Sequence, residues 1–402
     1  MPATSDLRAL EITEGDRDAS LSLSMAQAAW LAARKIGSVS PQSDGEWRVT
    51  GIQKVGVIRL DGLELRIRPK TPIARLLTLL ARGNQWGEWF DEDITLSATD
   101  DLLPSVAEAF GRWAERVLRG GVLQGYREYR SAEPFIRGRW LVAEQIRRRR
   151  GMPLPAELAY DEYTTDIAEN RIVRSAARRL LAVGELPRET RARLHRIDMR
   201  LANVSLLTRG LPLPGIRFDR RNGRYRPVIA LARLVLGHEA LEYLDGDVSG
   251  AGHLLNVARI FEDFVAAEVT RHAAAFGGEV QAQHASTLDH GGHVTIKPDL
   301  VWRRGGTVRA IFDAKYKVVH DERYPNADIY QMLSYCVRHG LAEGHLIYAE
   351  GSTLPSEIAV RSAGSGVAPV TVLCHAVDLS LPMPELEARL ARITARALSA
   401  PD

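Results

Sequence analysis

The last third of the chain carries the pattern that most restricts the fold, because its apolar periodicity alternates between helix and strand. A helical pattern begins at His253 and ends at the pair Gly277-Gly278. It is followed by three predicted strands, a second helix and a fourth strand, at 278–284, 293–302, 307–317, 327–340 and 344–350. A short mixed sheet flanked by helices lets both kinds of element bury an apolar face. The pattern therefore predicts a mixed α/β core.

The rest of the sequence divides into two further regions. Residues 1–100 predict an α+β unit, with helical spacing at 23–37 and an alternating hairpin pattern at 55–70, around Asp61-Gly62. Residues 101–236 are predicted to be mainly helical, with the clearest helical patterns at 103–123 and 166–186. Residues 237–402 complete the chain as the α/β core. We therefore expect an α+β multi-domain protein of three regions.

Composition excludes several classes of protein. No apolar run approaches the length of a membrane span, and the polar N-terminus lacks the pattern of a signal peptide. The two cysteines, Cys336 and Cys374, are too few for a disulfide framework or a four-ligand zinc site. We therefore expect a cytoplasmic protein without a membrane partner.

Positive charge is concentrated in the middle of the chain. Residues 111–150 hold eleven Arg against four Glu, and residues 188–226 hold eleven Arg against three acids. Arginine binds phosphate well, and each neutralised phosphate releases a counterion, so the two blocks together favour a nucleic-acid partner. Taken alone, a single run such as Arg147, Arg148, Arg149 and Arg150 is typical of a solvated helix face.

The distribution of lysine along the chain distinguishes the strand predicted at 307–317. The chain has six Lys against forty-seven Arg, and three of the six, Lys297, Lys315 and Lys317, lie within 22 residues. Side chains alternate along a strand, so Asp313 and Lys315 project from one face. Asp299 lies on the preceding strand. A four-residue loop at 303–306 would place it opposite Ala310, so the two carboxylates meet only if the strand bends or bulges.

Two converging carboxylates suit Mg²⁺, which keeps several waters and completes its shell with substrate phosphate. A neighbouring Lys can orient the attacking water or stabilise developing charge, which is the arrangement of a hydrolase. The same spacing also fits an ordinary hairpin with surface ion pairs. From the residues alone, both interpretations stay open.

Several segments resemble a known family. The pattern Pro298-Asp299 followed by Asp313-Ala314-Lys315 resembles the PD-(D/E)xK nuclease signature, and "QMLSY" at 331–335 is similar to the Q-x-x-x-Y element of RecB-like members. More specifically, the chain resembles McrC, the nuclease subunit of modification-dependent restriction systems. The resemblance covers most of the chain and rests on four segments in order, near residues 70, 165 and 260 and at 296–335.

This resemblance implies a restriction-endonuclease-like fold for 237–402 and a role for particular residues. Asp299 and Asp313 would be ligands of Mg²⁺, with Glu262 as a helix-borne acid at the edge of the metal site, and Lys315 would be the catalytic lysine. Gln331 and Tyr335 would support the site or touch DNA. Lys297 and Lys317 would contact phosphate at most. Without the resemblance, Glu262 is equally an exposed helix residue and Tyr335 a core residue.

The resemblance also implies partners. McrC-like proteins act with an McrB-like AAA+ GTPase ring, whose GTPase they stimulate, so the first hypothesis is an Mg²⁺-dependent endonuclease subunit that cuts modified duplex DNA. The front of the chain, residues 1–100, would dock into the ring together with the helical region. Two alternatives remain. One is a catalytically weak adaptor with a nuclease fold that activates a partner NTPase, and the other is a stand-alone RecB-like nuclease.

Overall fold

The computed structural model describes residues 8–16, 19–60, 62–83, 102–150, 152–182, 186–208, 210–237, 250–318, 326–350, 357–360 and 369–399. It contains two compact units. The first combines the described residues up to 83 with those from 250 onward, and the second comprises residues 103–237. None of the helices in these ranges is long and apolar enough to cross a lipid bilayer.

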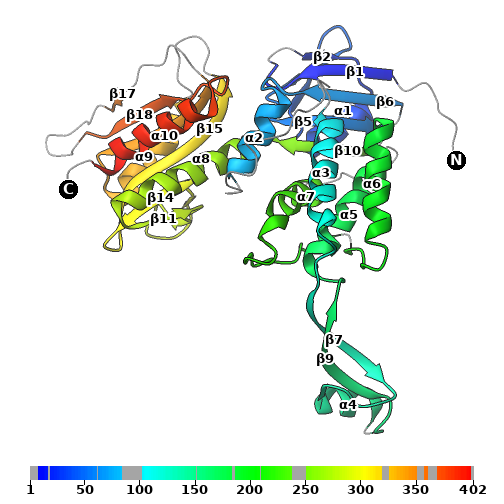
Figure 1. Cartoon of the computed structure of the whole chain (residues 1–402). Helices are drawn as coiled ribbons and strands as arrows, with labels where there is room; N and C mark the ends of the chain where they lie inside the picture. Colours follow the sequence, from blue (N-terminus) through cyan, green and yellow to red (C-terminus); the bar gives the residue numbers. More distant parts are fainter. Residues whose placement is uncertain are drawn as a thin grey trace. The chain divides into compact units, whose positions relative to one another are not determined.

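The N-terminal part of the first unit contains two small sheets (Figure 1). One has the order β1-β6-β5-β10, formed by Arg8–Thr13, Leu63–Arg68, Lys54–Leu60 and Gly250–Asn256. The other has the order β2-β4-β3, formed by Ala19–Leu21, Trp47–Thr50 and Ser38–Pro41. Helix α1 (Met25–Ala33) begins at Ser24, whose side chain accepts a hydrogen bond from the Gln27 backbone in a capping box. The predicted α+β character of this region is confirmed.

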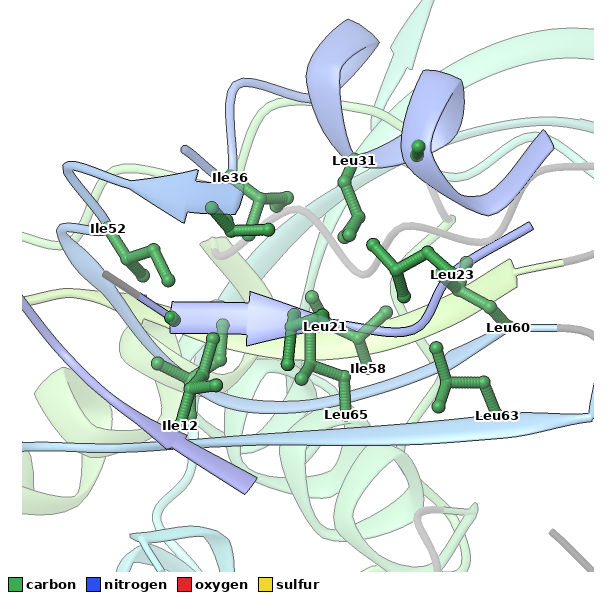
Figure 2. Packing of buried hydrophobic residues seen from close by; sticks show 14 of the residues in the cluster. Ile12, Leu21, Leu23, Leu31, Ile36, Ile52, Ile58, Leu60, Leu63 and Leu65 are labelled. Atoms are coloured by element: carbon green, nitrogen blue, oxygen red, sulfur yellow. The ribbon is translucent and has the colours of Figure 1, made fainter. Parts of the chain in front are cut away.

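Apolar side chains from both sheets and α1 form one core (Figure 2). Alternation along β5 and β6 directs Ile58, Leu60, Leu63 and Leu65 into it, each at most 2% exposed. The two strands pair through Leu60 and Leu63, which confirms the predicted hairpin. Asp61, the first residue of its predicted turn, lies outside the described residues.

The sequence-based boundary at 236/237 differs from the structure. Strand β10 pairs antiparallel with β5, so residues 250–256 complete the N-terminal sheet rather than begin the α/β core. Helix α2 (Ile73–Gly83) in turn packs on α8 (Val257–Ala273), where a Cβ on Gly83 would lie 2.9 Å from the backbone nitrogen of Phe264. These long-range contacts make the front and the back of the chain one unit. The boundary predicted at 100/101 falls at the edge of segment 84–101, outside the described residues.

The second unit contains the two helices that the sequence predicts, α3 (Leu102–Arg119) and α5 (Ala168–Ala182). It also contains α6 (Arg188–Arg200) and α7 (Arg226–Gly237), which the sequence analysis did not predict individually, with a short 3-10 turn η2 (Gly223–Tyr225) before α7. Helix α5 packs against both α6 and α7, and its buried face includes Ile172, Val173 and Leu180. These side chains recur at helical spacing, which is why the pattern was visible in the sequence.

The second unit also contains a sheet that the sequence analysis did not predict. Strands β7 (Gly125–Glu133) and β9 (Ala156–Thr164) pair over nine residues, and the short β8 (Arg139–Trp140) pairs with the other edge of β9. Figure 1 shows β7 and β9 leading away from the helices, with α4 (Val142–Arg149) at the far end. The expectation of a mainly helical middle is therefore wrong for the three strands between residues 125 and 164, although α4 within that range is helical. Few of these side chains enter a core, so the apolar signal of a strand is weak there.

The α/β core is a six-stranded mixed sheet of order β11-β14-β15-β16-β18-β17. In that order its strands are Glu279–Ala282, Leu300–Arg304, Thr307–Val318, Glu343–Glu350, Thr371–Ala376 and Glu357–Ala359. A separate ribbon pairs β12 (Ser286–Thr287) with β13 (Thr295–Ile296), and η3 (Ala274–Phe276) follows α8. The predicted α/β core is confirmed, and β17, β18 and the C-terminal helix extend it beyond the predicted elements.

Helices cover both faces of this sheet (Figure 1). Helices α8 and α10 (Met383–Leu398) pack on each other and on β15, whereas α9 (Asn326–His339) packs on β15, β16 and β18 from the other side. Met332, Tyr335 and Cys336 of α9 meet Ile311 of β15 in a continuous cluster. The central strand β15 is therefore buried on both faces, and a polar residue within it lies beneath a helix.

Candidate active site

The pairing of β14 with β15 brings Asp299 and Asp313 together. Leu300 pairs with Phe312 and Trp302 with Ala310, so the same register, continued by one residue, places Asp299 opposite Asp313. Nearer the turn the register shifts by one, because Arg303 pairs with Val308. This bulge leaves one extra residue on β15. Without it, Asp299 would lie opposite Phe312, on the wrong face of the strand.

The turn itself is tighter than the expected four-residue loop. Arg304 pairs with Thr307, which leaves only Gly305 and Gly306 in the turn, at φ values of 59° and 82°. Two successive positive φ values are typical of a type I′ turn and favour glycine at both positions. The expected placement of Asp299 opposite Ala310 is therefore wrong. The bulge that the sequence analysis required for the two carboxylates to meet is present.

Asp313 is a buried carboxylate, 2% exposed, in the middle of the sheet. Burial and then the negative charge of Asp299 raise the pKa of Asp313 to about 6. The Lys315 ammonium lies 2.5 Å from its Oδ2, but that oxygen accepts no hydrogen bond of good geometry from any described residue. Asp313 and Lys315 therefore form a buried ion pair, and the carboxylate keeps further lone pairs that can bind a cation.

Asp299 and Glu262 supply further negative charge. Asp299 Oδ2 accepts a hydrogen bond of 2.9 Å from the backbone N–H of Ala314, which fixes the carboxylate beside Asp313. Burial raises the pKa of Asp299 above its usual range. Glu262, half-buried on α8, has its pKa raised to about 7 by burial and then by the charge of Asp299. The predicted position of Glu262 at the edge of the site agrees with this electrostatic contact.

Lys315 is held by a chain of polar contacts. Its Nζ donates to Gln331 Oε1 at 2.9 Å, Gln331 Nε2 donates to the Tyr335 hydroxyl at 2.7 Å, and that hydroxyl donates to the Lys297 carbonyl at 3.2 Å. Burial lowers the pKa of Lys315, but the neighbouring carboxylates, Asp313 first, raise it more, so the ammonium keeps its proton. Tyr335, 2% exposed, both packs in the core and supports the site.

Two predicted phosphate contacts have different surroundings. Lys317 Nζ donates to both oxygens of Asp328, at 2.8 and 3.1 Å, so its charge is balanced within the protein. Asp328 is 3% exposed and also accepts from the Tyr348 hydroxyl. The sequence analysis missed Asp328, although its position three residues before Gln331 in the same helix was a usable signal. The Lys297 side chain is exposed beside the site.

The residues present fit a hard divalent cation. Within the described ranges no group of three or more His, Cys, Asp or Glu side chains is close enough to share one ion. Mg²⁺ needs less than that, since one or two carboxylates commonly hold it and water and phosphate oxygens complete its shell. The carboxylates of Asp299 and Asp313, which the register of β14 and β15 brings together, form such a donor pair.

The run Arg147–Arg150 lies in the second unit, in and just after α4. Arg149 Nε lies 3.2 Å from a Glu157 oxygen, and Arg148 lies within 4.0 Å of both Glu144 and Glu157. The charge of two of the four arginines is therefore partly balanced inside α4 and β9. Arg147 and Arg150 are exposed.

The comparisons agree with this architecture. A chain of the refined half-complex from the tetradecameric assembly of Thermococcus gammatolerans McrB AAA+ hexamers with bound McrC is 17% identical, with a TM-score of 0.53 over 96% of this chain and 98% of that one. A chain of the cryo-EM structure of the T. gammatolerans McrBC complex is also 17% identical, with a TM-score of 0.37 over 66% of this chain and 88% of that one. None of the curated proteins matches. The first likeness shows a shared fold.

The family model described as McrBC 5-methylcytosine restriction system component matches residues 49–349. That range includes the β5–β6 hairpin, the whole second unit and the Asp299, Asp313 and Lys315 cluster. The resemblance seen in the sequence is thereby confirmed, and the chain belongs to the McrBC 5-methylcytosine restriction system component family.

Proposed function

We propose that this chain is the DNA-cleaving subunit of a modification-dependent restriction system, a metal-dependent phosphodiester hydrolase of the PD-(D/E)xK type that works in the cytoplasm. The observation that carries the proposal is the bulge in β15, which aligns Asp299 with Asp313 and leaves Lys315 on the same face. A plain surface hairpin would not bury a carboxylate at its centre with a second carboxylate and a lysine beside it.

Each residue of the cluster has a separate task in this proposal. Mg²⁺ held by Asp299 and Asp313, with Glu262 beside them, would polarise the phosphodiester and lower the pKa of a bound water. Lys315 donates to a phosphate oxygen and stabilises the negative charge that develops there. Gln331 fixes the direction of the Lys315 ammonium, and Tyr335 fixes Gln331.

A second surface supports action with a partner. Large apolar side chains are exposed along β7, β9 and α4 and in the loops between them, including Tyr126 at 77%, Ile136 at 63%, Ile146 at 62%, Met152 at 60% and Tyr163 at 59%. Exposed apolar surface of this extent is typical of a protein interface. The solved structure of similar fold holds McrB AAA+ hexamers with bound McrC, so the partner proposed here is an McrB-like AAA+ GTPase ring. We therefore propose that docking uses residues 125–164 rather than residues 1–100.

The test is cleavage of modified duplex DNA by the chain together with its ring partner, GTP and Mg²⁺. Asp313→Ala should abolish cleavage without loss of fold, because it removes a proposed metal ligand and not a core contact. Retained cleavage by this variant would refute the nuclease assignment. Stimulation of partner GTP hydrolysis by the same variant would show that the adaptor role is separate from cutting. DNA degradation without any partner would instead support the stand-alone nuclease.

A further inference from the structure

A cavity of about 460 Å³ lies within the first unit, between the ends of the N-terminal strands and the end of β15. Its lining comes from segments far apart in the sequence, at residues 14–15, 51–53, 70–72, 316–317 and 378–380, with Ala349. None of the proposed nuclease residues except Lys317 takes part in it. The cavity is therefore separate from the cluster of Asp299, Asp313 and Lys315.

Glu14 is the unusual residue in this cavity. It is 2% exposed, yet neither of its carboxylate oxygens accepts a hydrogen bond of good geometry from any residue that the structure describes. Burial raises the pKa of Glu14 to about 7, and looser hydrogen bonds from the Lys70 backbone and the Tyr316 side chain, together with the Lys70 charge, lower this pKa only in part. Buried carboxyls are nearly always paired, because an unpaired one costs free energy. A carboxyl kept in this condition beside an open volume indicates a ligand that is not part of the chain.

The other walls show which ligand chemistry fits. The Lys70 side chain lies along Gly15, since a Cβ on Gly15 would be 3.3 Å from Lys70 Nζ. Gly15 directly follows Glu14 in the sequence, so the Lys70 ammonium lies near Glu14. The Tyr316 and Thr71 hydroxyls lie 3.2 Å apart and add neutral hydrogen-bonding groups. The remaining wall combines an apolar part, formed by Ile52, Pro72, Ala349 and Leu379, with the polar residues Gln53, Lys317, Asp378 and Ser380.

We propose that this cavity binds one unpaired nucleotide, with its base against the apolar wall and hydrogen-bonded to Glu14, and its phosphate near Lys70. A volume of about 460 Å³ holds a mononucleotide and excludes a duplex. Proteins that hold an unstacked base use apolar or aromatic walls together with a few hydrogen bonds to the base edge, which is the combination found here. A carboxyl can offer two acceptors when ionised, or a donor and an acceptor when protonated, and both patterns match base edges.

The position of the cavity links it to the proposed cleavage. Tyr316 and Lys317 follow Lys315 directly on β15, and two residues of an extended strand span about 7 Å. The inference therefore deepens the proposed function: a strand whose phosphodiester lies at Lys315 could place a neighbouring unpaired nucleotide in the cavity. Binding of a nucleotide can nevertheless be measured without cleavage.

The experiment is isothermal titration of the full chain in EDTA. The probes are 2′-deoxycytidine 5′-monophosphate, 2′-deoxyadenosine 5′-monophosphate, a ten-nucleotide single strand and the matching duplex. Asp313→Asn serves as a background in which DNA cannot be cut. One nucleotide should bind per chain in both backgrounds, and Glu14→Leu should weaken binding at least about tenfold, the effect of losing a hydrogen bond to a charged group. Binding of the single strand but not the free nucleotides would identify the strand as the source.

Controls separate the site from general effects. Glu14→Leu removes no hydrogen bond of good geometry and relieves the burial of a carboxyl group, so the melting temperature of this variant should not fall. Lys70→Ala, at an exposed position, is a second variant that should also weaken binding. Glu11→Leu on the same strand, whose ion pair with Arg68 lies outside the cavity lining, should bind like the natural chain. Absence of nucleotide binding, binding unaffected by Glu14→Leu, or preference for arginine or spermidine over nucleotides would overturn the proposal. Each result is independent of whether Asp313 supports cleavage.

Discussion

Replacing Asp313 by Asn should stabilise the metal-free protein at neutral and alkaline pH. The pKa of Asp313 is raised from 3.8 to about 6 by burial and by the charge of Asp299. Below pH 3.8 the carboxyl is protonated in both folded and unfolded chains, so its titration costs no stability. As the pH rises through the window from 3.8 to about 6, the unfolded chain loses the proton first and the folded state is penalised. Above pH 6 the penalty is complete.

The size of this penalty follows from the shift. A rise of roughly two pKa units at about 1.4 kcal/mol per unit corresponds to on the order of 3 kcal/mol. Asp313 is 2% exposed, so solvent screening does not reduce the figure much, and the attraction of Lys315 is already included because it lowers the same pKa. An Asn side chain resembles the protonated carboxyl in shape and has no charge. A gain of about 3 kcal/mol would raise the melting temperature by roughly 5–10 °C.

The assay is thermal unfolding followed by calorimetry in EDTA at pH 8 and again near pH 4. Asp313→Asn should melt higher than the natural chain at pH 8, and the difference should shrink at pH 4. Asp16→Asn, at an exposed site, is the control and should change little. Equal or lower stability of Asp313→Asn at pH 8, or a difference independent of pH, would refute the argument that this carboxylate is held at a cost.

Addition of Mg²⁺ extends the same experiment. A cation that binds only the folded state stabilises it according to the ratio of its concentration to its dissociation constant, by about 2.7 kcal/mol at a hundredfold excess. The natural chain should therefore gain stability in millimolar Mg²⁺, and Asp313→Asn should gain much less. Equal gains for both proteins would place the cation elsewhere.

Four other outcomes follow from the structure. Lys315→Arg should be as inactive in DNA cleavage as Lys315→Ala, because a planar guanidinium cannot replace a compact ammonium. Gln331→Leu should lower kcat about tenfold with little change in KM, and Tyr335→Phe should have a smaller effect, since each acts through Lys315. Changing Arg147–Arg149 to Glu should weaken DNA binding for all sequences alike and flatten its salt dependence, by about 0.9 per lost phosphate contact; unchanged affinity and slope would indicate a solvated or docking face. Ile136→Asp should weaken binding to the ring partner, measured by sedimentation, and should leave the DNA cleavage chemistry intact. Unaltered association would indicate that the docking surface lies elsewhere.

Elements with a strong local signal could be predicted from the sequence. The hairpin of β5 and β6, helix α8 and strand β15 each bury one or both faces at regular spacing, so their side chains report the element directly. Periodicity failed for β7, whose side chains lie at exposed and half-buried positions without entering a core, and for β9, in which only the first four residues are buried, in one unbroken run without alternation. The pairing of β10 with β5 could not be predicted either, because nearly two hundred residues separate the two strands.

For the candidate site, the sequence by itself determined which residues to propose: Asp299, Asp313 and Lys315 stand out by residue type, spacing and family resemblance. Only the tertiary structure decided that they meet. One extra residue in the β15 bulge moves Asp299 from the level of Phe312 to that of Asp313, and side chains reverse face with every residue, so a single step of register separates this cluster of two carboxylates and a lysine from a plain hairpin. Packing between distant segments likewise decided the surroundings of two further carboxyl groups. Asp328 balances the charge of Lys317, whereas Glu14 lies in its cavity without a hydrogen bond of good geometry. Local periodicity indicates which residues are buried, but it does not indicate which buried charged side chain has an oppositely charged partner.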